Sequence, residues 1–202
     1  MCRLTTAEGV DTMSSYSAIA DIGNAIIKLL RDNMCPEPVP NAETILMCPA
    51  GEKGDFLLGL HLYDMQESGD YRQVNMVNVT DRIRRNPPIA LTLSYILTVN
   101  SSAHISSKSI DEQRILGRAM QVLYDYPILQ PGAITNYDQN APPVAITPNN
   151  LPFEEKSKLW SSLNTPSKLA LYYKVSPILI DSTKTVESSR VASMDIVFKQ
   201  RQ

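Results

Sequence analysis

The sequence predicts an α+β fold, in which helices pack on a mixed, mostly antiparallel sheet. Residues Ile89–Val99 alternate between apolar and polar side chains, which is the period of a half-buried strand. Two other segments, about Ser17–Asp32 and Ser109–Tyr126, carry apolar residues at helical spacing. Strand-like segments follow one another too often for a doubly wound parallel sheet, which favours helices packed on a single sheet.

The first quarter of the chain predicts a helix, an extended connector and a strand. The helix is expected over about Ser17–Asp32. Pro36, Pro38 and Pro40 predict the connector, because proline fixes its own φ and restricts the residue before it. A short strand is expected next, over Thr44–Cys48.

A long polar segment separates the next two expected strands. Phe56–Met65 is apolar on both faces, which favours a central strand, and Ile89–Val99 is the clearest strand of the chain. Between them, Gln66–Asn86 is polar and has no clear period. A segment of this length in a compact domain is typical of a functional loop or an extended hairpin.

The second helix has the best-defined local signals. Ser109 and Glu112 have the spacing of a capping box, which predicts that the helix begins there. Pro127 prevents the helix from continuing past Tyr126. The segment Ile128–Asn150 is rich in Pro, Asn and Gly and is expected to be mainly loop.

A short strand, a third helix and two more strands complete the expected order, over Val144–Thr147, Pro152–Leu163, Lys168–Ile180 and Arg190–Lys199. Asn150 is the expected cap of the third helix. The apolar side changes across Pro177, which predicts a bulge or an edge position in that strand.

Length and composition indicate a single globular domain. A chain of 202 residues can bury one sizeable core, so residues 16–202 are expected to form one domain after a disordered tail over residues 1–15. The net charge of −2 argues against a general nucleic-acid binder. Three cysteines without a CxxC pair fit a reducing compartment. With no signal-peptide pattern and no apolar run near 20 residues, we expect assembly in the cytoplasm and no membrane association.

No motif organises residues for nucleotide binding or nucleophilic catalysis. Gly54 and Gly59 are spaced like the ends of a phosphate-binding loop, but Leu60 and His61 stand where Lys and Ser/Thr are required. The two histidines, His61 and His104, fall in an apolar strand and a Ser-rich loop rather than beside a nucleophile motif. We therefore expect no enzyme activity and no cofactor.

A metal site is not expected either. Cys35, Cys48 and His61 are the candidate ligands, and their spacing is not that of a known metal motif. A packing role for these side chains is favoured.

A local basic cluster, Arg82, Arg84 and Arg85, has three interpretations. It could contact nucleic acid phosphates, lie on a merely solvated loop, or dock an acidic protein surface, since arginine is enriched at protein interfaces.

Several long segments, in a constant order, resemble one protein family. They are Tyr16–Asn33, Pro36–Ile45, Gly54–Gln73, Pro87–Thr98, Glu112–Leu129 and Leu159–Ser182. Together they resemble the N-terminal domain shared by the tube-cap, or terminator, proteins of phage-tail-like contractile injection systems. Some relatives carry a further C-terminal domain, and residues 1–15 have no counterpart in the resemblance.

The resemblance implies a fold like that of phage tail terminators and a structural role. Such subunits form a hexameric ring on the distal end of the inner tube, stop its growth and couple the last sheath layer to it. The implied partners are further copies of the chain, the inner tube protein and the sheath protein, with neither nucleic acid nor membrane. The particle is one that is released or membrane-anchored. The rival interpretations are a nucleic-acid-binding module that uses Arg82–Arg85 and a small enzyme of unrecognised type.

The hypothesis assigns the protein contacts to two segments. In the first, the loop Gln66–Asn86 contacts the tube or a neighbouring protomer through residue types favoured at interfaces: Tyr71, Arg72, Gln73, Arg82, Arg84 and Arg85. In the second, Asp195–Gln202, with Asp195 and Phe198, adds a strand to a sheath subunit, although an ordinary strand of the protomer's own sheet is the simpler interpretation.

Overall fold

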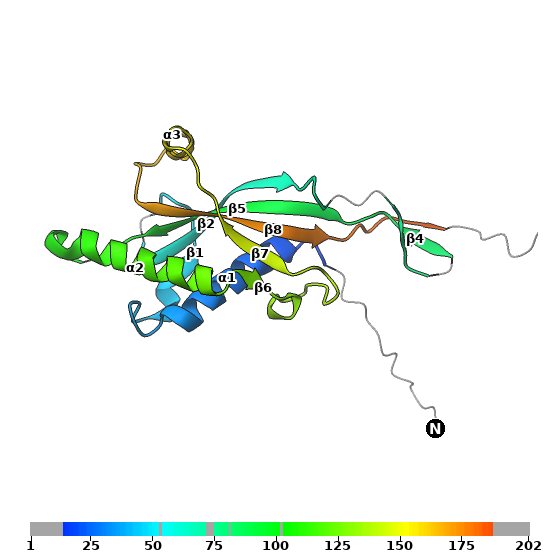
Figure 1. Cartoon of the computed structure of the whole chain (residues 1–202), viewed down its shortest axis with the longest axis horizontal. Coiled ribbons are helices and arrows are strands. Elements are labelled where there is room, and N and C mark those ends of the chain that lie inside the picture. Colours follow the sequence, from blue (N-terminus) through cyan, green and yellow to red (C-terminus); the bar gives the residue numbers. More distant parts are fainter. Residues whose placement is uncertain (1–13, 53, 72–74, 81, 102, 188–202) are drawn as a thin grey trace, which may run out of the picture.

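The computed structural model describes residues 14–52, 54–71, 75–80, 82–101 and 103–187, and its centre is a six-stranded sheet (Figure 1). The strands of this sheet are β1 (Ile45–Met47), β2 (Leu58–Glu67), β5 (Ile89–Val99), β6 (Ile128–Leu129), β7 (Val144–Pro148) and β8 (Ala170–Ile180). The helices are α1 (Ala18–Met34), α2 (Ile105–Asp125) and α3 (Phe153–Ser162), with 3-10 turns η1 (Ala42–Thr44) and η2 (Pro131–Ala133).

The large sheet is mixed and mostly antiparallel, as the sequence predicts. Its strand order is β1-β2-β5-β8-β7-β6. The β1–β2 pair is parallel, and the other four neighbouring pairs are antiparallel. With helices on both faces, the architecture is α+β, which confirms the predicted fold class.

The main core lies between the sheet and the layer formed by α1 and α2. Leu30 of α1 and Ala119 of α2 are fully buried in one cluster with Leu93 and Leu97 of β5. Burial of an aliphatic side chain of this size contributes about 1.5–3 kcal/mol. Alternate side chains of β5 enter this core, and this produces the apolar alternation seen in the sequence.

The opposite face of the sheet is covered by α3. Trp160 of α3 packs on Ile96 of β5 and Tyr172 of β8 in a second, smaller cluster. The indole Nε1 of Trp160 donates a hydrogen bond of 2.9 Å to the Tyr172 hydroxyl. The middle of β5 is therefore buried on both faces.

One end of the sheet extends beyond the helices. The distal parts of β2, β5 and β8 project there and lead into a second sheet formed by β3 (Val77–Asn78), β4 (Ile83–Arg85) and β9 (Thr185–Glu187), in the order β3-β4-β9 (Figure 1). We refer to the described residues within 64–90 and 178–187 as the β arm. The polar segment Gln66–Asn86 therefore contains short strands, which agrees with the extended hairpin, one of its two predicted alternatives, rather than with the loop.

One predicted helix start and one predicted helix cap are wrong. The second helix begins at Ile105, one turn before Ser109, because the imidazole of His104 accepts a hydrogen bond from the Ser106 amide and so caps it. Asn150 does not cap the third helix: its N-cap residue is Pro152, which supplies no side-chain hydrogen bond.

The predicted irregularity in β8 is a bulge. Leu91 of β5 pairs with Ile178 and Leu93 pairs with Val175, so two residues of β8 oppose Thr92 alone. The edge position considered for this strand is wrong, because β8 pairs with β5 and with β7.

The ends of the chain differ from the expected plan where they are described. Ser14, which we assigned to a tail, is buried in the folded body. The strand predicted over Arg190–Lys199 lies outside the described residues, and the last strand that the structure describes is β9.

Candidate interaction surfaces

The described histidines and cysteines lie in places that suit a role in packing or helix capping. Burial lowers the pKa of His61, on β2, and His104 caps α2. Burial, with a smaller contribution from Glu52, raises the pKa of the Cys48 thiol to about 11. Within the described residues, no group of three or more His, Cys, Asp or Glu side chains is placed to hold a metal ion. Nor is any helix in that part of the chain long and apolar enough to cross a bilayer.

The β arm carries several of the side chains predicted to lie at an interface. Tyr71, directly after β2, is 47% exposed. Arg82 and Arg84 are exposed at the start and middle of the β4 segment. Arg85 is also described, whereas the other predicted residues, Arg72, Gln73, Asp195 and Phe198, lie outside the described residues.

The three arginines of the basic cluster do not share one face of the arm. Arg84 pairs with Asn78 and Val186, whereas Arg85 pairs with Val77 and Thr185. Successive side chains of a strand point to opposite faces, so Arg84 and Arg85 face opposite ways. A continuous phosphate-binding patch would need them on one side.

Arg85 is held at the junction between the arm and the body. Its Nη2 donates to Asp181 Oδ1 at 2.9 Å, and both side chains are largely buried. Asp181 also accepts a hydrogen bond from the Ser14 amide through Oδ2, at 3.0 Å, and its own amide donates to the Ser14 carbonyl at 2.9 Å. The Ser14 hydroxyl in turn accepts from the Asp138 amide at 3.0 Å.

This junction links four parts of the chain that are distant in sequence. It joins the entry to α1, the loop before β7, the end of β8 and the end of β4. Separating Arg85 from Asp181 would leave an uncompensated buried charge, which is costly. The ion pair therefore fixes the position of the arm relative to the body.

The arm also exposes more apolar surface than a solvated hairpin needs. Met65 and Ile89 are 54% and 55% exposed, although both lie on strands whose other ends form the core. Further exposed apolar side chains of the arm are Met76, Val79 and Val186. Exposed apolar residues that gather on one element mark sites of protein contact.

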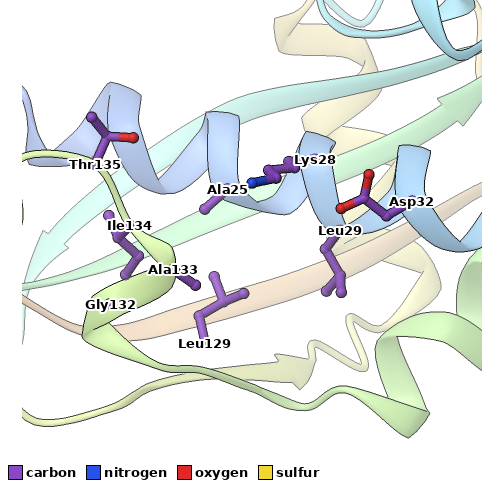
Figure 2. Close-up of a pocket in the computed structure, with 9 residues that line it drawn as sticks. All are labelled: Ala25, Lys28, Leu29, Asp32, Leu129, Gly132, Ala133, Ile134 and Thr135. Carbon is purple, nitrogen blue, oxygen red and sulfur yellow. The ribbon is translucent and has the colours of Figure 1, made fainter.

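A hollow of about 400 Å³ lies between α1 and the segment that follows α2 (Figure 2). Leu29 of α1 and Leu129 of β6 point into it, and Lys28 and Asp32 stand at the α1 side. The hollow is open, and its lining residues form no arrangement of groups suited to catalysis. Sequence reasoning did not find it, because its two walls are distant in the chain.

The outward side of α2 is a second feature that sequence reasoning missed. Ile110, Met120 and Tyr124 are exposed there, and Tyr124 is 82% exposed. The signal was available in the spacing, because Ile110, Gly117 and Tyr124 are seven residues apart and lie opposite the buried stripe.

Residues 21–193 match the model of the Pvc16 N-terminal domain. The solved structures that share the fold include the following two. One is the sheath/tube terminator, in its extended state, of PVC, an extracellular contractile injection system. Its TM-score is 0.63 at 14% sequence identity, and the match covers 91% of this chain and 64% of that one. The other is the tube-terminating cap of the anti-feeding prophage, with a TM-score of 0.58 at 18% identity, over 89% of this chain and 61% of that one.

These comparisons concern the fold and the family. The chain spans less than two thirds of the length of either solved structure. No curated protein matches the sequence.

Proposed function

Because the chain belongs to the Pvc16 N-terminal domain family, we propose that it is a structural cap on the inner tube of a contractile injection system. The observation that carries this proposal is the fold shared with a sheath/tube terminator and a tube-terminating cap, over about nine-tenths of this chain. In the proposed role the chain binds the distal end of the tube, stops its growth and ties the last sheath layer to it.

The geometry suits such a role. The body is a sheet with helices packed on both faces. Such a close-packed body is rigid, so it can keep its shape when a partner binds on one side. The arm projects from that body, anchored through Arg85 and Asp181, and exposes aromatic, apolar and cationic side chains. These residue types are the ones that protein interfaces favour, so the arm is the proposed contact with tube or sheath.

We further propose that copies of the chain form a ring, hexameric as the family resemblance implies. A ring closes through head-to-tail contacts between unlike surfaces of neighbouring copies. The role is structural: it needs contacts with copies, tube and sheath, and no bond is made or broken. The chain then belongs to a phage-tail-like particle that is assembled inside the producing cell.

Particle length tests the proposal. Particles made without this chain are expected to have tubes and sheaths of variable length, because nothing stops their growth. Complementation with the wild-type chain should restore a single length in negative-stain micrographs. A single, unchanged length in the absence of the chain would contradict the cap function.

A further inference from the structure

Helix α2 buries one apolar stripe, and its opposite side exposes apolar residues among the polar side chains Gln113, Arg114 and Gln121. The buried stripe consists of Ile115, Leu116, Ala119, Val122 and Leu123. At 3.6 residues per turn, Ile110, Gly117 and Tyr124 lie in one line on the opposite side, with Met120 beside them. A surface helix of a monomer normally has a polar outer side, so this outer stripe is unusual.

Gly117 leaves a recess in the middle of the outer stripe. A Cβ atom built at Gly117 would meet nothing within 4 Å, so the space above the helix backbone is open. Ile110 and Tyr124 stand on either side, each about 10 Å away along the helix axis. Glycine costs a helix roughly 1 kcal/mol relative to alanine, and a close approach by another side chain is one reason to keep it there.

The opposite layer of the molecule carries a matching protrusion. Phe153, the first residue of α3, is 85% exposed. The next two residues, Glu154 and Glu155, are exposed as well. The N-terminus of α3 therefore presents one aromatic ring beside two carboxylates.

The charges of the two surfaces are complementary. Arg114 is exposed on α2 at the flank of the outer stripe. Arg118, one turn further, is already engaged, since its guanidinium donates to the Asn33 carbonyl and to Gln121. Arg114 is exposed beside the outer stripe, so its charge is complementary to the charges of Glu154 and Glu155.

We propose that the outer stripe of α2 is the docking site for the α3 N-terminus, Phe153–Glu155, of a second copy of this chain. Phe153 fills the recess at Gly117, and Glu154 and Glu155 face Arg114. The two surfaces lie on opposite faces of the sheet, with α2 below and α3 above it in Figure 1, so the contact is head-to-tail and can propagate into a ring. The inference rests on the proposed function, because it identifies the ring contact of the cap.

The contact is the centre of the interface rather than its whole. A standard interface buries about 800 Å² on each partner, which is more than one helix face and one helix end supply. A buried aromatic anchor within a rim of charges is the arrangement that concentrates binding energy at such a centre.

Cross-linking in assembled particles tests the contact. The chain would carry Gly117→Cys and Phe153→Cys, with serine in place of its native Cys2, Cys35 and Cys48, and the particles would be treated with a short bismaleimide. Both positions are exposed, so the fold should persist, and circular dichroism checks it. We expect a ladder of covalent multimers. The matched control keeps Gly117→Cys and moves the second cysteine to Lys28, which is exposed on α1 in the same layer as α2. This control, like each single variant, should give at most traces.

The outcomes separate the contact from the cap function. A chain that is present on the particles but gives no more multimer than the control overturns the docking site and leaves the cap function standing. A wild-type chain that is missing from the particles overturns the cap function, and the docking site with it.

A charge exchange provides a second measurement that needs no cysteine. Arg114→Glu alone should lower the retention of the chain on diluted particles about threefold or more, since like charges then face one another. Adding Glu154→Arg and Glu155→Arg in the same chain should restore most of that loss. Retention that falls further in the combined variant would contradict the pairing.

Discussion

The body and the β arm share the strands β2, β5 and β8, and on β2 and β5 the two ends of the strand differ in burial. On β5, Leu93 and Leu97 are fully buried in the body, whereas Ile89 is more than half exposed in the arm. On β2, Leu58 is fully buried and Met65 is exposed. Apolar side chains thus occur at both ends of these two strands, and they continue an apolar surface beyond the point where the helices cover it. In the body that surface stabilises the fold, and in the arm it is available to a partner.

The largest expected effect is on the free energy of unfolding, and it is seen by comparing one strand position in the body with one in the arm. Leu97→Ala should lower the free energy of unfolding by about 2–5 kcal/mol, because it empties space in the core. Met65→Ala should cost less than about 1 kcal/mol, because its side chain is largely in solvent. Urea denaturation followed by circular dichroism measures both, and equal losses would show that the arm is packed as tightly as the body.

A second prediction tests the Arg85–Asp181 junction between the body and the arm. Arg85→Ala should destabilise the protein by about 2 kcal/mol, because Asp181 loses a charged hydrogen-bond partner in a largely buried place. Its neighbour in the sequence provides the control: Arg84→Ala, on the exposed side of β4, should change stability by less than about 0.5 kcal/mol. Proteolysis of the arm, followed by mass spectrometry, should be faster in the Arg85 variant alone. Similar behaviour of both variants would remove the junction from the account.

A third prediction concerns the smaller core beneath α3. Tyr172→Phe should cost about 1 kcal/mol, because the buried indole N–H of Trp160 loses its acceptor. The fluorescence of Trp160, the single tryptophan of the chain, should change at the same time. Tyr124→Phe removes a hydroxyl from an exposed site and should change neither the stability nor the spectrum.

Substitutions of exposed side chains in the arm should have the smallest effect on stability. They should instead reduce assembly of the chain into particles. Tyr71→Ala combined with Arg84→Glu should leave the urea midpoint unchanged, because both side chains are exposed. The same variant should reduce the fraction of particles that carry the chain, counted after gel filtration. Arg85 is left intact, because its replacement would confuse a contact with the fold. Full occupancy by this variant would exclude these two residues from the contact with tube or sheath.

Local pattern was sufficient to predict much of the fold. The bounds of β5 follow from its apolar alternation, and the bulge in β8 follows from the change of side across Pro177. The start of α2 was predicted one turn too late, because several polar residues precede the helix and the one that caps it is His104.

The interaction surfaces depended on long-range structure, which local pattern does not contain. The strand β4 pairs with β9, about one hundred residues later, and Arg85 bonds with Asp181, 96 residues away. Of the three clustered arginines, Arg85 therefore has a structural role in the fold, and Arg82 and Arg84 are exposed. The outer stripe of α2 has a readable spacing, but only the structure shows that the other stripe of the same helix is the one that meets the core.

Cryo-electron microscopy of intact particles that contain this chain tests the central claim most directly. With an antibody fragment bound to a tag on the chain, we expect density at the end of the tube opposite the baseplate and along no other part of the particle. That density should accept the body and the β arm described above as one unit. Label along the sheath or at the baseplate, or a distal end complete without this chain, would contradict the assignment as a tube cap.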